Sequence, residues 1–222
     1  MVFKTVGGYC FGSSSLLPEE ILLPLISAFQ DAVSDSSSTL EGRRPVSKLT
    51  LPQIGDVVVK HYRRGGWVAR INQKYYLRTG KTRCQVEYEQ VARAGRLGVN
   101  VPEPVAFAFQ GRLFYQAWLI TKEIAHQQTL ARLGRLEPGR LPAVLDSLRT
   151  QVSKMAAQGL WHVDLHPGNV LVDEGGRVFL VDFDKTRTFR GSKRQLLTKY
   201  RKRWRRAVKK HGLPEPLAAA LG

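Results

Sequence analysis

Residues 162–169 read His-Val-Asp-Leu-His-Pro-Gly-Asn, and residues 182–184 read Asp-Phe-Asp. Two short apolar runs, 170–172 and 178–181, lie between these stretches on either side of an Asp-Glu-Gly-Gly turn, which predicts a β-hairpin. An Asp-Phe-Asp on its own carries little information, because acidic residues follow many strands. Polar residues at fixed spacing around both a loop and a hairpin are a much rarer combination, and this combination is specific enough to indicate a fold.

The loop and the end of the hairpin supply the groups that phosphoryl transfer requires. That reaction needs a carboxylate that orients the attacking hydroxyl and accepts its proton, together with oxygen ligands that hold Mg²⁺ on a triphosphate. Asp164 is the candidate base, and Asn169 and Asp182 are the candidate metal ligands. His162 is expected to brace the loop as a structural residue, while the role of His166 stays open.

The rest of the chain alternates between predicted strands and helices in an order that indicates two lobes. Spacing of apolar residues and turn residues predicts helices over 18–33, 85–97 and 142–157, and strands over 46–51, 57–61, 105–109 and 113–121. The first half is thus strand-rich with one embedded helix, and the second half is mainly helical. We expect an N-terminal helix and extension (1–39), an N-terminal lobe (40–123) and a C-terminal lobe (124–222), with a hinge at 121–124.

In these features the chain resembles the protein-kinase-like superfamily. The resemblance implies an α+β, two-lobed fold, with an antiparallel-sheet N-terminal lobe containing one helix and a minimal, mainly helical C-terminal lobe. It also implies ATP and Mg²⁺ as cofactors. Lys60 resembles the strand lysine that holds the nucleotide phosphates, and Glu87 resembles its helix partner, with Glu89 as the competitor. Lys60 follows three valines in a strand that reads as buried, where an unpaired ammonium group would be costly.

The expected cover over the phosphates departs from the superfamily pattern. Residues 40–46 of the predicted N-terminal lobe carry a single glycine, Gly42, instead of a G-x-G-x-x-G loop. Arg43 and Arg44 would there contribute charge in place of backbone N–H groups, so Gly42 and Arg43 are the candidate nucleotide contacts.

The sequence after the metal aspartate favours a small acceptor over a peptide. Asp184 replaces the glycine of D-F-G, no A-P-E anchor is present, and 40 residues follow Asp182. A peptide-binding platform does not fit this pattern. We therefore expect a sugar or a lipid-linked sugar as the acceptor.

Within that group the chain is similar to the kinases of 3-deoxy-D-manno-octulosonic acid (Kdo), in the lipopolysaccharide-kinase family of Gram-negative bacteria. The resemblance covers most of residues 40–205 and is carried by 60–66, 75–83, Glu87, 97–105, 114–121 and the loop through Lys185. It implies ATP-dependent phosphorylation of a Kdo hydroxyl, with the 4-hydroxyl favoured, on Kdo–lipid A during synthesis of the lipopolysaccharide inner core. It also implies a protein that is peripheral to the cytoplasmic face of the inner membrane.

The charge distribution independently predicts an anionic partner. The chain has 35 Lys and Arg against 18 Asp and Glu, and two blocks without any acidic residue, 57–86 and 185–214, hold much of the excess. Because Kdo carries a carboxylate and lipid A carries phosphates, the candidate anion-binding residues of the first block are Arg63, Arg64, Arg78 and Arg83. The second block spaces apolar residues at helical intervals among its cations, which predicts a basic amphipathic helix that can also face an anionic membrane.

Composition and motifs leave two other functions open. A chain that is 43% hydrophobic can bury a core, and Cys10 and Cys84 form no metal or disulfide pattern, so a folded protein of a reducing compartment is expected. A small RIO-like kinase on RNA or ribosomes would explain the basic blocks, although RNA-reading motifs are missing and nucleic acid is a less favoured partner. An aminoglycoside or sugar phosphotransferase would explain the catalytic loop but not those blocks.

Overall fold

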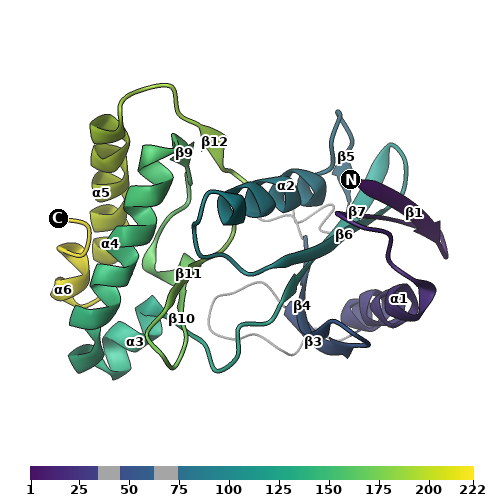
Figure 1. Cartoon of the computed structure of the whole chain (residues 1–222), viewed down its shortest axis with the longest axis horizontal. Coiled ribbons are helices and arrows are strands. Elements are labelled where there is room, and N and C mark those ends of the chain that lie inside the picture. The colour runs from purple at the N-terminus through teal and green to yellow at the C-terminus, as the bar shows by residue number, and fades with distance from the viewer. Residues whose placement is uncertain (35–45, 63–74) are drawn as a thin grey trace. The chain divides into compact units, whose positions relative to one another are not determined.

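The structure is a computed structural model that describes residues 1–34, 46–62 and 75–222 (Figure 1). The chain divides into two compact units, the first made of residues 1–89 and 103–123 and the second of residues 90–102 and 124–222. The first unit is rich in antiparallel strands and the second in helices. The predicted kinase-like α+β fold is therefore confirmed.

A seven-stranded antiparallel sheet forms the first unit. Its strands follow the order β1-β2-β6-β7-β4-β3, and β5 pairs with β7 beyond the end of β4. The strands are β1 (Val2–Val6), β2 (Tyr9–Ser13), β3 (Val46–Leu51), β4 (Gly55–His61), β5 (Tyr76–Leu77), β6 (Pro104–Gln110) and β7 (Phe114–Lys122). The four longest strands, β3, β4, β6 and β7, match the sequence prediction, because each contains apolar residues and is bounded by Gly, Pro or polar turn residues.

The β1–β2 hairpin was not predicted. Through this hairpin, residues that were expected to form an N-terminal extension are part of the main sheet. Val6 pairs with Tyr9, and β2 pairs along β6. The two-residue turn consists of Gly7 and Gly8, with φ of 57° and 81°. Positive φ at both turn positions matches the twist of a tight hairpin and favours glycine, so the Gly-Gly pair between two apolar runs was the signal to use.

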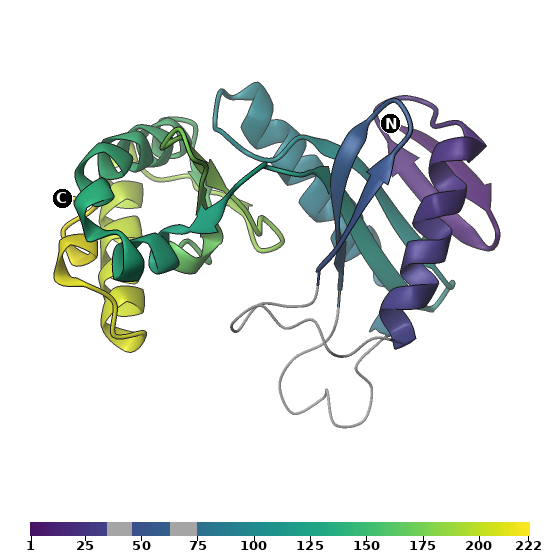
Figure 2. The ribbon, with the colours of Figure 1, turned by 90° about the horizontal axis from the view of Figure 1, so that it is seen from below.

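Two helices cover the two faces of this sheet (Figure 2). Helix α1 (Glu19–Ser34) packs through Leu22, Leu25 and Phe29 with one face, and α2 (Arg83–Arg96) packs through Cys84 and Tyr88 with the other. Side chains in β6 and β7 alternate between the two faces, as the period of a strand requires. Those on the α1 side are Ala106, Ala108, Trp118 and Ile120, and those on the α2 side are Phe107, Phe109, Ala117 and Leu119.

The end of α2 and the segment that follows it, residues 90–102, belong to the second unit, although they lie between two parts of the first unit in sequence. Gly98, with φ of 75°, ends α2, and the Val99 N–H bonds back to the carbonyl of Ala94. Asn100 then ties this segment to its unit. Its backbone N–H binds the Gln151 side chain at 2.8 Å, and its side chain binds the Val178 carbonyl at 3.1 Å.

The second unit packs helices around a small sheet and one apolar core. Its longer helices, α4 and α5, lie side by side, as Figures 1 and 2 both show. The hairpin β10–β11 confirms the strands expected from the sequence, and β8 adds a third strand to it. The elements are β8 (Gln128–Thr129), α3 (Leu130–Leu136), η2 (Pro138–Arg140), α4 (Leu141–Ala157), β9 (Leu160–Trp161), η3 (Pro167–Asn169), β10 (Val170–Val172), β11 (Val178–Leu180), β12 (Arg187–Thr188), α5 (Lys193–Lys210) and α6 (Glu215–Ala218).

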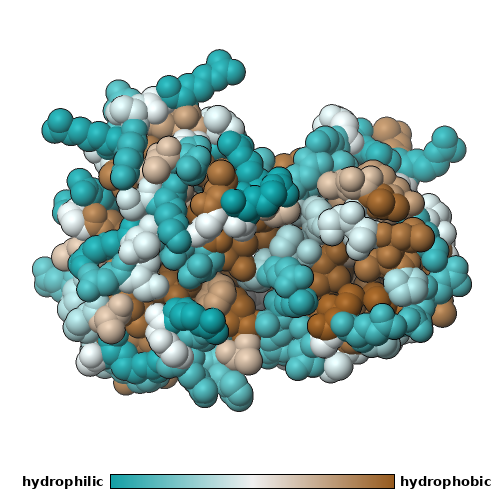
Figure 3. Space-filling view, in the orientation of Figure 1, coloured by the Kyte–Doolittle hydropathy of each residue, from teal (hydrophilic) through white to brown (hydrophobic). Residues whose placement is uncertain are grey.

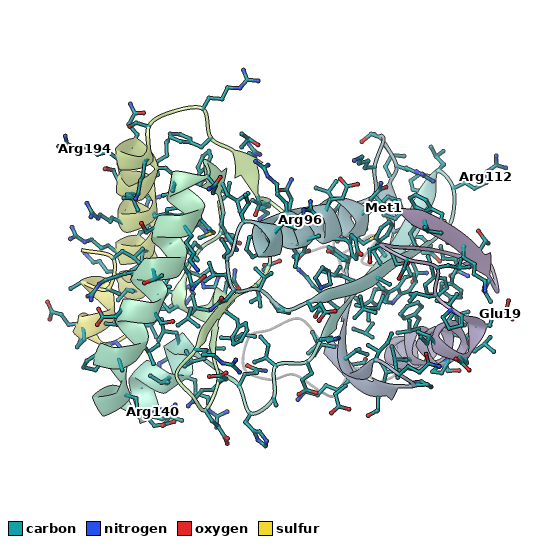
Figure 4. All side chains as sticks on the ribbon, viewed as in Figure 1. Met1, Glu19, Arg96, Arg112, Arg140 and Arg194 are labelled. Carbon is teal, nitrogen blue, oxygen red and sulfur yellow. The ribbon has the colours of Figure 1, made fainter. Side chains whose placement is uncertain are left out.

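Helix α5 is the predicted basic amphipathic helix. It begins with a capping box between Ser192 and Gln195. Its apolar stripe is buried in the core of the second unit, so this stripe serves packing and not insertion into lipid; the buried members are Leu196, Tyr200, Trp204 and Val208. The other faces carry the cations, and in Figure 4 Arg194 projects outward from the first turn of the helix.

Candidate active site

Lys60 in β4 and Glu87 in α2 are in contact within the first unit. Both carboxylate oxygens of Glu87 lie 2.9 Å from the ammonium nitrogen of Lys60, and the Tyr62 hydroxyl donates to the same carboxylate. The Glu87 side chain is only 2% exposed, so burial without a cation would be costly. Glu89, the competitor in the sequence, pairs with Lys81 instead. The buried carboxylate thus holds the lysine in one position. A lysine that binds a phosphate at a defined place needs such support.

Asp164 and Asn169 lie in one loop of the second unit, which Asn169 closes on itself. Asp164 is in the turn after β9, and Asn169 is the last residue of η3. The side-chain amide nitrogen of Asn169 donates to the backbone carbonyl of Asp164 at 3.0 Å. Because the nitrogen is used inside the loop, the amide oxygen is the atom that remains to face a metal ion.

Hydrogen bonds through Val181 join this loop to the position of Asp182, just after β11. The Val181 N–H donates to the carbonyl of Asn169 at 3.1 Å, and the Val181 carbonyl accepts from Nε2 of His162 at 2.9 Å. Asp182 itself has φ of 69°, in the left-handed region that aspartate and asparagine tolerate better than most residues. The backbone next to each of the three candidate residues therefore belongs to one hydrogen-bonded network.

His162 acts as a neutral brace beneath this network. Its ring is 1% exposed and packs edge-on against Phe183, with ring centroids 4.8 Å apart. Burial lowers the pKa of His162 below its usual value of 6.5, while the charges of Asp182 and Asp164 act in the opposite direction. Both carboxylates thus lie within electrostatic reach of one buried ring. Among the described residues its Nδ1 has no hydrogen-bond partner, so the brace rests on the Nε2 bond and on packing.

The donor set of the second unit suits Mg²⁺. Magnesium prefers oxygen ligands and is usually bound through one or two carboxylates, with substrate phosphates and water completing its shell. Asp182 and Asn169 supply a carboxylate and an amide oxygen with an assigned orientation. In the described part of the chain no three His, Cys, Asp or Glu side chains cluster as a metal cage would require.

Of the four arginines proposed for substrate anions, the structure describes two, and both lie over aromatic rings of the first unit. The Arg78 guanidinium lies 4.9 Å from the centre of the Phe109 ring, and that of Arg83 lies 5.0 Å from Tyr76. Arg78 also lines an open pocket of about 530 Å³ together with Phe3, Phe109 and Arg112. The other candidates in this part of the chain, Gly42, Arg43, Arg63 and Arg64, lie outside the described residues.

Sequence reasoning missed Arg203, which reaches the candidate base. Its guanidinium Nη2 donates to Oδ1 of Asp164. One turn earlier on α5, the Tyr200 hydroxyl accepts from the His162 N–H at 2.9 Å and donates to the Leu160 carbonyl at 2.5 Å. Arg203 stands in a run of cations with no local feature that separates it from Lys202 or Arg205. The available signal was that Arg203 follows Tyr200 by three residues. This spacing can be interpreted only once the fold is known.

Known proteins resemble this chain over most of its length. The family model described as "Lipopolysaccharide kinase (Kdo/WaaP) family" matches residues 28–209. A 3-deoxy-D-manno-octulosonic acid kinase of Vibrio vulnificus is 32% identical over 182 residues, which is 79% of this chain and 75% of that protein. A protein of the same name from Photobacterium profundum is 38% identical over 146 residues, or 64% and 59% of the two chains.

The match to the family model covers the candidate residues of each unit. It contains the Lys60–Glu87 pair as well as the loop with Asp164 and Asn169 and the position of Asp182. The chain belongs to the lipopolysaccharide kinase (Kdo/WaaP) family and is a phosphotransferase whose acceptor is an alcohol group.

Proposed function

We propose that this kinase transfers the γ-phosphate of ATP to the 4-hydroxyl of Kdo on Kdo–lipid A, in the synthesis of the lipopolysaccharide inner core. Family membership and the names of its relatives support the class of acceptor. The observation that carries the proposal is the network through Val181, which joins the Asp164 loop to Asp182. A base and two metal ligands need this kind of rigid support to act on one phosphoryl group.

In the proposed reaction, Asp164 orients the acceptor hydroxyl and takes its proton. The hydroxyl oxygen forms a new bond to the γ-phosphorus, and the bond from that phosphorus to the β–γ bridging oxygen breaks, with its electron pair leaving on ADP. Lys60, held by Glu87, binds nucleotide phosphates and offsets their charge. A magnesium ion held by Asn169 and Asp182 would neutralise charge on the β- and γ-phosphate oxygens.

We further propose that the protein works at an anionic membrane surface, on the cytoplasmic face of the inner membrane. The part of the chain that the structure describes contains no helix with the length and apolar character to cross a bilayer. Helix α5 presents its cations away from its buried stripe, and Figure 3 shows a largely hydrophilic surface over α5 and α4. Each Lys or Arg close to an anionic leaflet contributes about 1 kcal/mol to binding, so a few such contacts suffice for reversible attachment.

The first unit adds an apolar contribution to the same proposed attachment. Exposed side chains gather at the turn between β6 and β7 and at its neighbour β5, where Leu113 is 61%, Phe114 56% and Leu77 47% exposed. Leu77 pairs directly with Phe114. Arg112, on the turn itself, points away from the sheet in Figure 4. Exposed apolar groups beside arginine suit the boundary between lipid headgroups and acyl chains.

The test of the proposed acceptor is direct. The purified protein is incubated with ATP, Mg²⁺ and Kdo–lipid A, and mass spectrometry follows the acceptor for the mass of one added phosphate. Nuclear magnetic resonance of the product then assigns the phosphorylated hydroxyl. Parallel incubations offer an aminoglycoside and ribosomal RNA. Phosphate on the Kdo 4-hydroxyl is the expected result, whereas transfer to RNA or the aminoglycoside with none to Kdo would overturn the proposal.

A further inference from the structure

Arg203 occupies an unusual place among the cations of α5. Lys202, Arg205 and Arg206 are exposed, whereas Arg203 is half-buried and its Nη2 donates to the carboxylate of Asp164. The pair is partly open to solvent, with side-chain exposures of 41% for Arg203 and 28% for Asp164. Ion pairs this exposed contribute little to folding stability. Stability alone therefore does not account for a cation beside the proposed base.

The hydrogen-bonding capacity of Arg203 is only partly used within the protein. A guanidinium has five N–H donors in a planar fork that matches a carboxylate or phosphate in two-point contact. Nε of Arg203 is buried and has no hydrogen-bond partner among the residues that the structure describes. A buried donor without a partner calls for an explanation, and a ligand that arrives with a second anionic group provides one.

Two histidines extend the same side of Asp164 with further donors. The rings of His166 and His211 lie 6.2 Å apart, between centroids. Nδ1 of His166 accepts from the Gly168 N–H at 3.1 Å, which leaves Nε2 as the protonated nitrogen of the neutral ring. Burial lowers the pKa of His166 below its usual value, the charge of Asp164 raises it, and the charges of His211 and Arg203 lower it further. Gly168 permits this arrangement, because a Cβ there would lie 2.8 Å from the imidazole ring of His166.

We propose that Arg203 binds the carboxylate of the acceptor sugar, with His211 and His166 beside it, while Asp164 engages the hydroxyl that is phosphorylated. This inference rests on the proposed function. In a 3-deoxy-2-ulosonic acid the acid carbon and the carbon bearing the 4-hydroxyl are separated by a few bonds. A sugar whose hydroxyl meets Asp164 therefore brings its carboxylate close to the side chain that Asp164 already contacts. The class of acceptor that this site selects is a sugar acid, not a neutral sugar.

The test pairs a change in the protein with a change in the acceptor. Wild type, Arg203→Gln and Arg203→Lys are assayed on Kdo–lipid A and on the same acceptor with its Kdo carboxylate converted to the methyl ester. Neutral detergent micelles replace the membrane, so that surface charge does not contribute. Arg132→Gln is the matched control, because Arg132 is exposed on α3 and the substitution removes the same charge from the same unit.

Wild type is expected to prefer the acid over the ester by about tenfold to a hundredfold in kcat/KM, the worth of a hydrogen bond to a charged group. Arg203→Gln loses this preference, mainly through a higher KM for the acid, while its KM for ATP stays unchanged. Arg203→Lys restores part of the preference, because lysine supplies the positive charge but lacks the planar two-point donor geometry of arginine. Arg132→Gln keeps the full preference.

These measurements distinguish a failure of the inference about Arg203 from a failure of the proposed function. If Arg203→Gln is folded and active yet prefers the acid over the ester as strongly as wild type, Arg203 does not bind the carboxylate and the inference fails. If wild type phosphorylates neither form of the acceptor, the proposed function fails first. Thermal unfolding of each variant establishes that it is folded before either conclusion is drawn.

Discussion

Asp182 combines two demands that few side chains meet together. Its φ of 69° requires a residue that tolerates the left-handed region, and the metal-binding role that we propose for it requires an oxygen ligand. Aspartate and asparagine meet the first demand, and only aspartate brings a full charge. The spacing of Asp182 from Asn169 was a reason to single out this residue. For Arg203 the only signal was its spacing of three from Tyr200, which has meaning once the fold shows that both side chains reach the loop from a distant helix.

Substitutions at Asp182 separate these demands. Asp182→Asn keeps the backbone tolerance and removes the charge, so phosphoryl transfer should fall by about two orders of magnitude or more while the free energy of unfolding stays near that of wild type. Asp182→Ala should lose as much activity as Asp182→Asn. It should also have a free energy of unfolding ~1–2 kcal/mol lower than that of wild type, because alanine resists a positive φ. Kinetics and urea unfolding measure the two effects. An Asp182→Asn protein with wild-type turnover would remove this residue from the metal site.

At the scale of elements, the local patterns of the sequence predicted the helices and strands that make up most of the framework. Helices α1, α2 and α4 and strands β3, β4, β6 and β7 carry clear apolar periods. The short elements β8, β9 and β12 were missed because two-residue strands have no period to read, and tertiary pairing alone defines them. The β1–β2 hairpin is different, since its Gly-Gly turn was a readable signal.

Helix α5 supports the catalytic loop as well as closing the core, and Tyr200 tests this role. Tyr200→Phe keeps the ring but removes the hydroxyl that serves the His162 N–H and the Leu160 carbonyl, at a cost of about 1–3 kcal/mol in stability. Loosening the residues next to Asp164 should also lower kcat several-fold. Trp204→Phe is the comparison, because it removes a bond from the same helix to Leu217, away from the loop.

Both α5 variants are compared at a temperature well below either unfolding transition. A lower kcat in Tyr200→Phe, with Trp204→Phe unchanged, would place the effect at the loop. Equal kcat values in the two variants would mean that the Tyr200 hydroxyl contributes only to stability.

At the scale of the whole molecule, charge and exposed apolar side chains both favour work at an anionic membrane. Composition was sufficient to predict the anionic partner, because two long blocks lack any carboxylate. It could not locate the apolar groups near the β6–β7 turn, since exposure of Leu113 or Phe114 depends on how the hairpin ends. The fold is thus needed to say which surface meets the membrane.

Vesicle binding tests that surface. The wild-type protein should bind vesicles rich in phosphatidylglycerol, bind phosphatidylcholine vesicles weakly, and dissociate as salt screens the charge. Replacing Leu113 and Phe114 by serine should weaken binding at least several-fold without a change in net charge. Leu136→Ser is the control, because Leu136 is 63% exposed in the other unit. Equal binding by the double variant and the wild type would exclude the β6–β7 turn from the contact.

We expect Asp164 to accept the proton of the acceptor hydroxyl beside a bound magnesium nucleotide. The most direct measurement is the single-turnover rate of phosphate transfer to Kdo–lipid A for wild type and Asp164→Ala, with the affinity for Mg²⁺–ATP measured on the same preparations. A fall in transfer of about 10²- to 10⁴-fold with nucleotide affinity retained is expected. Wild-type transfer by the Asp164→Ala protein would contradict the claim.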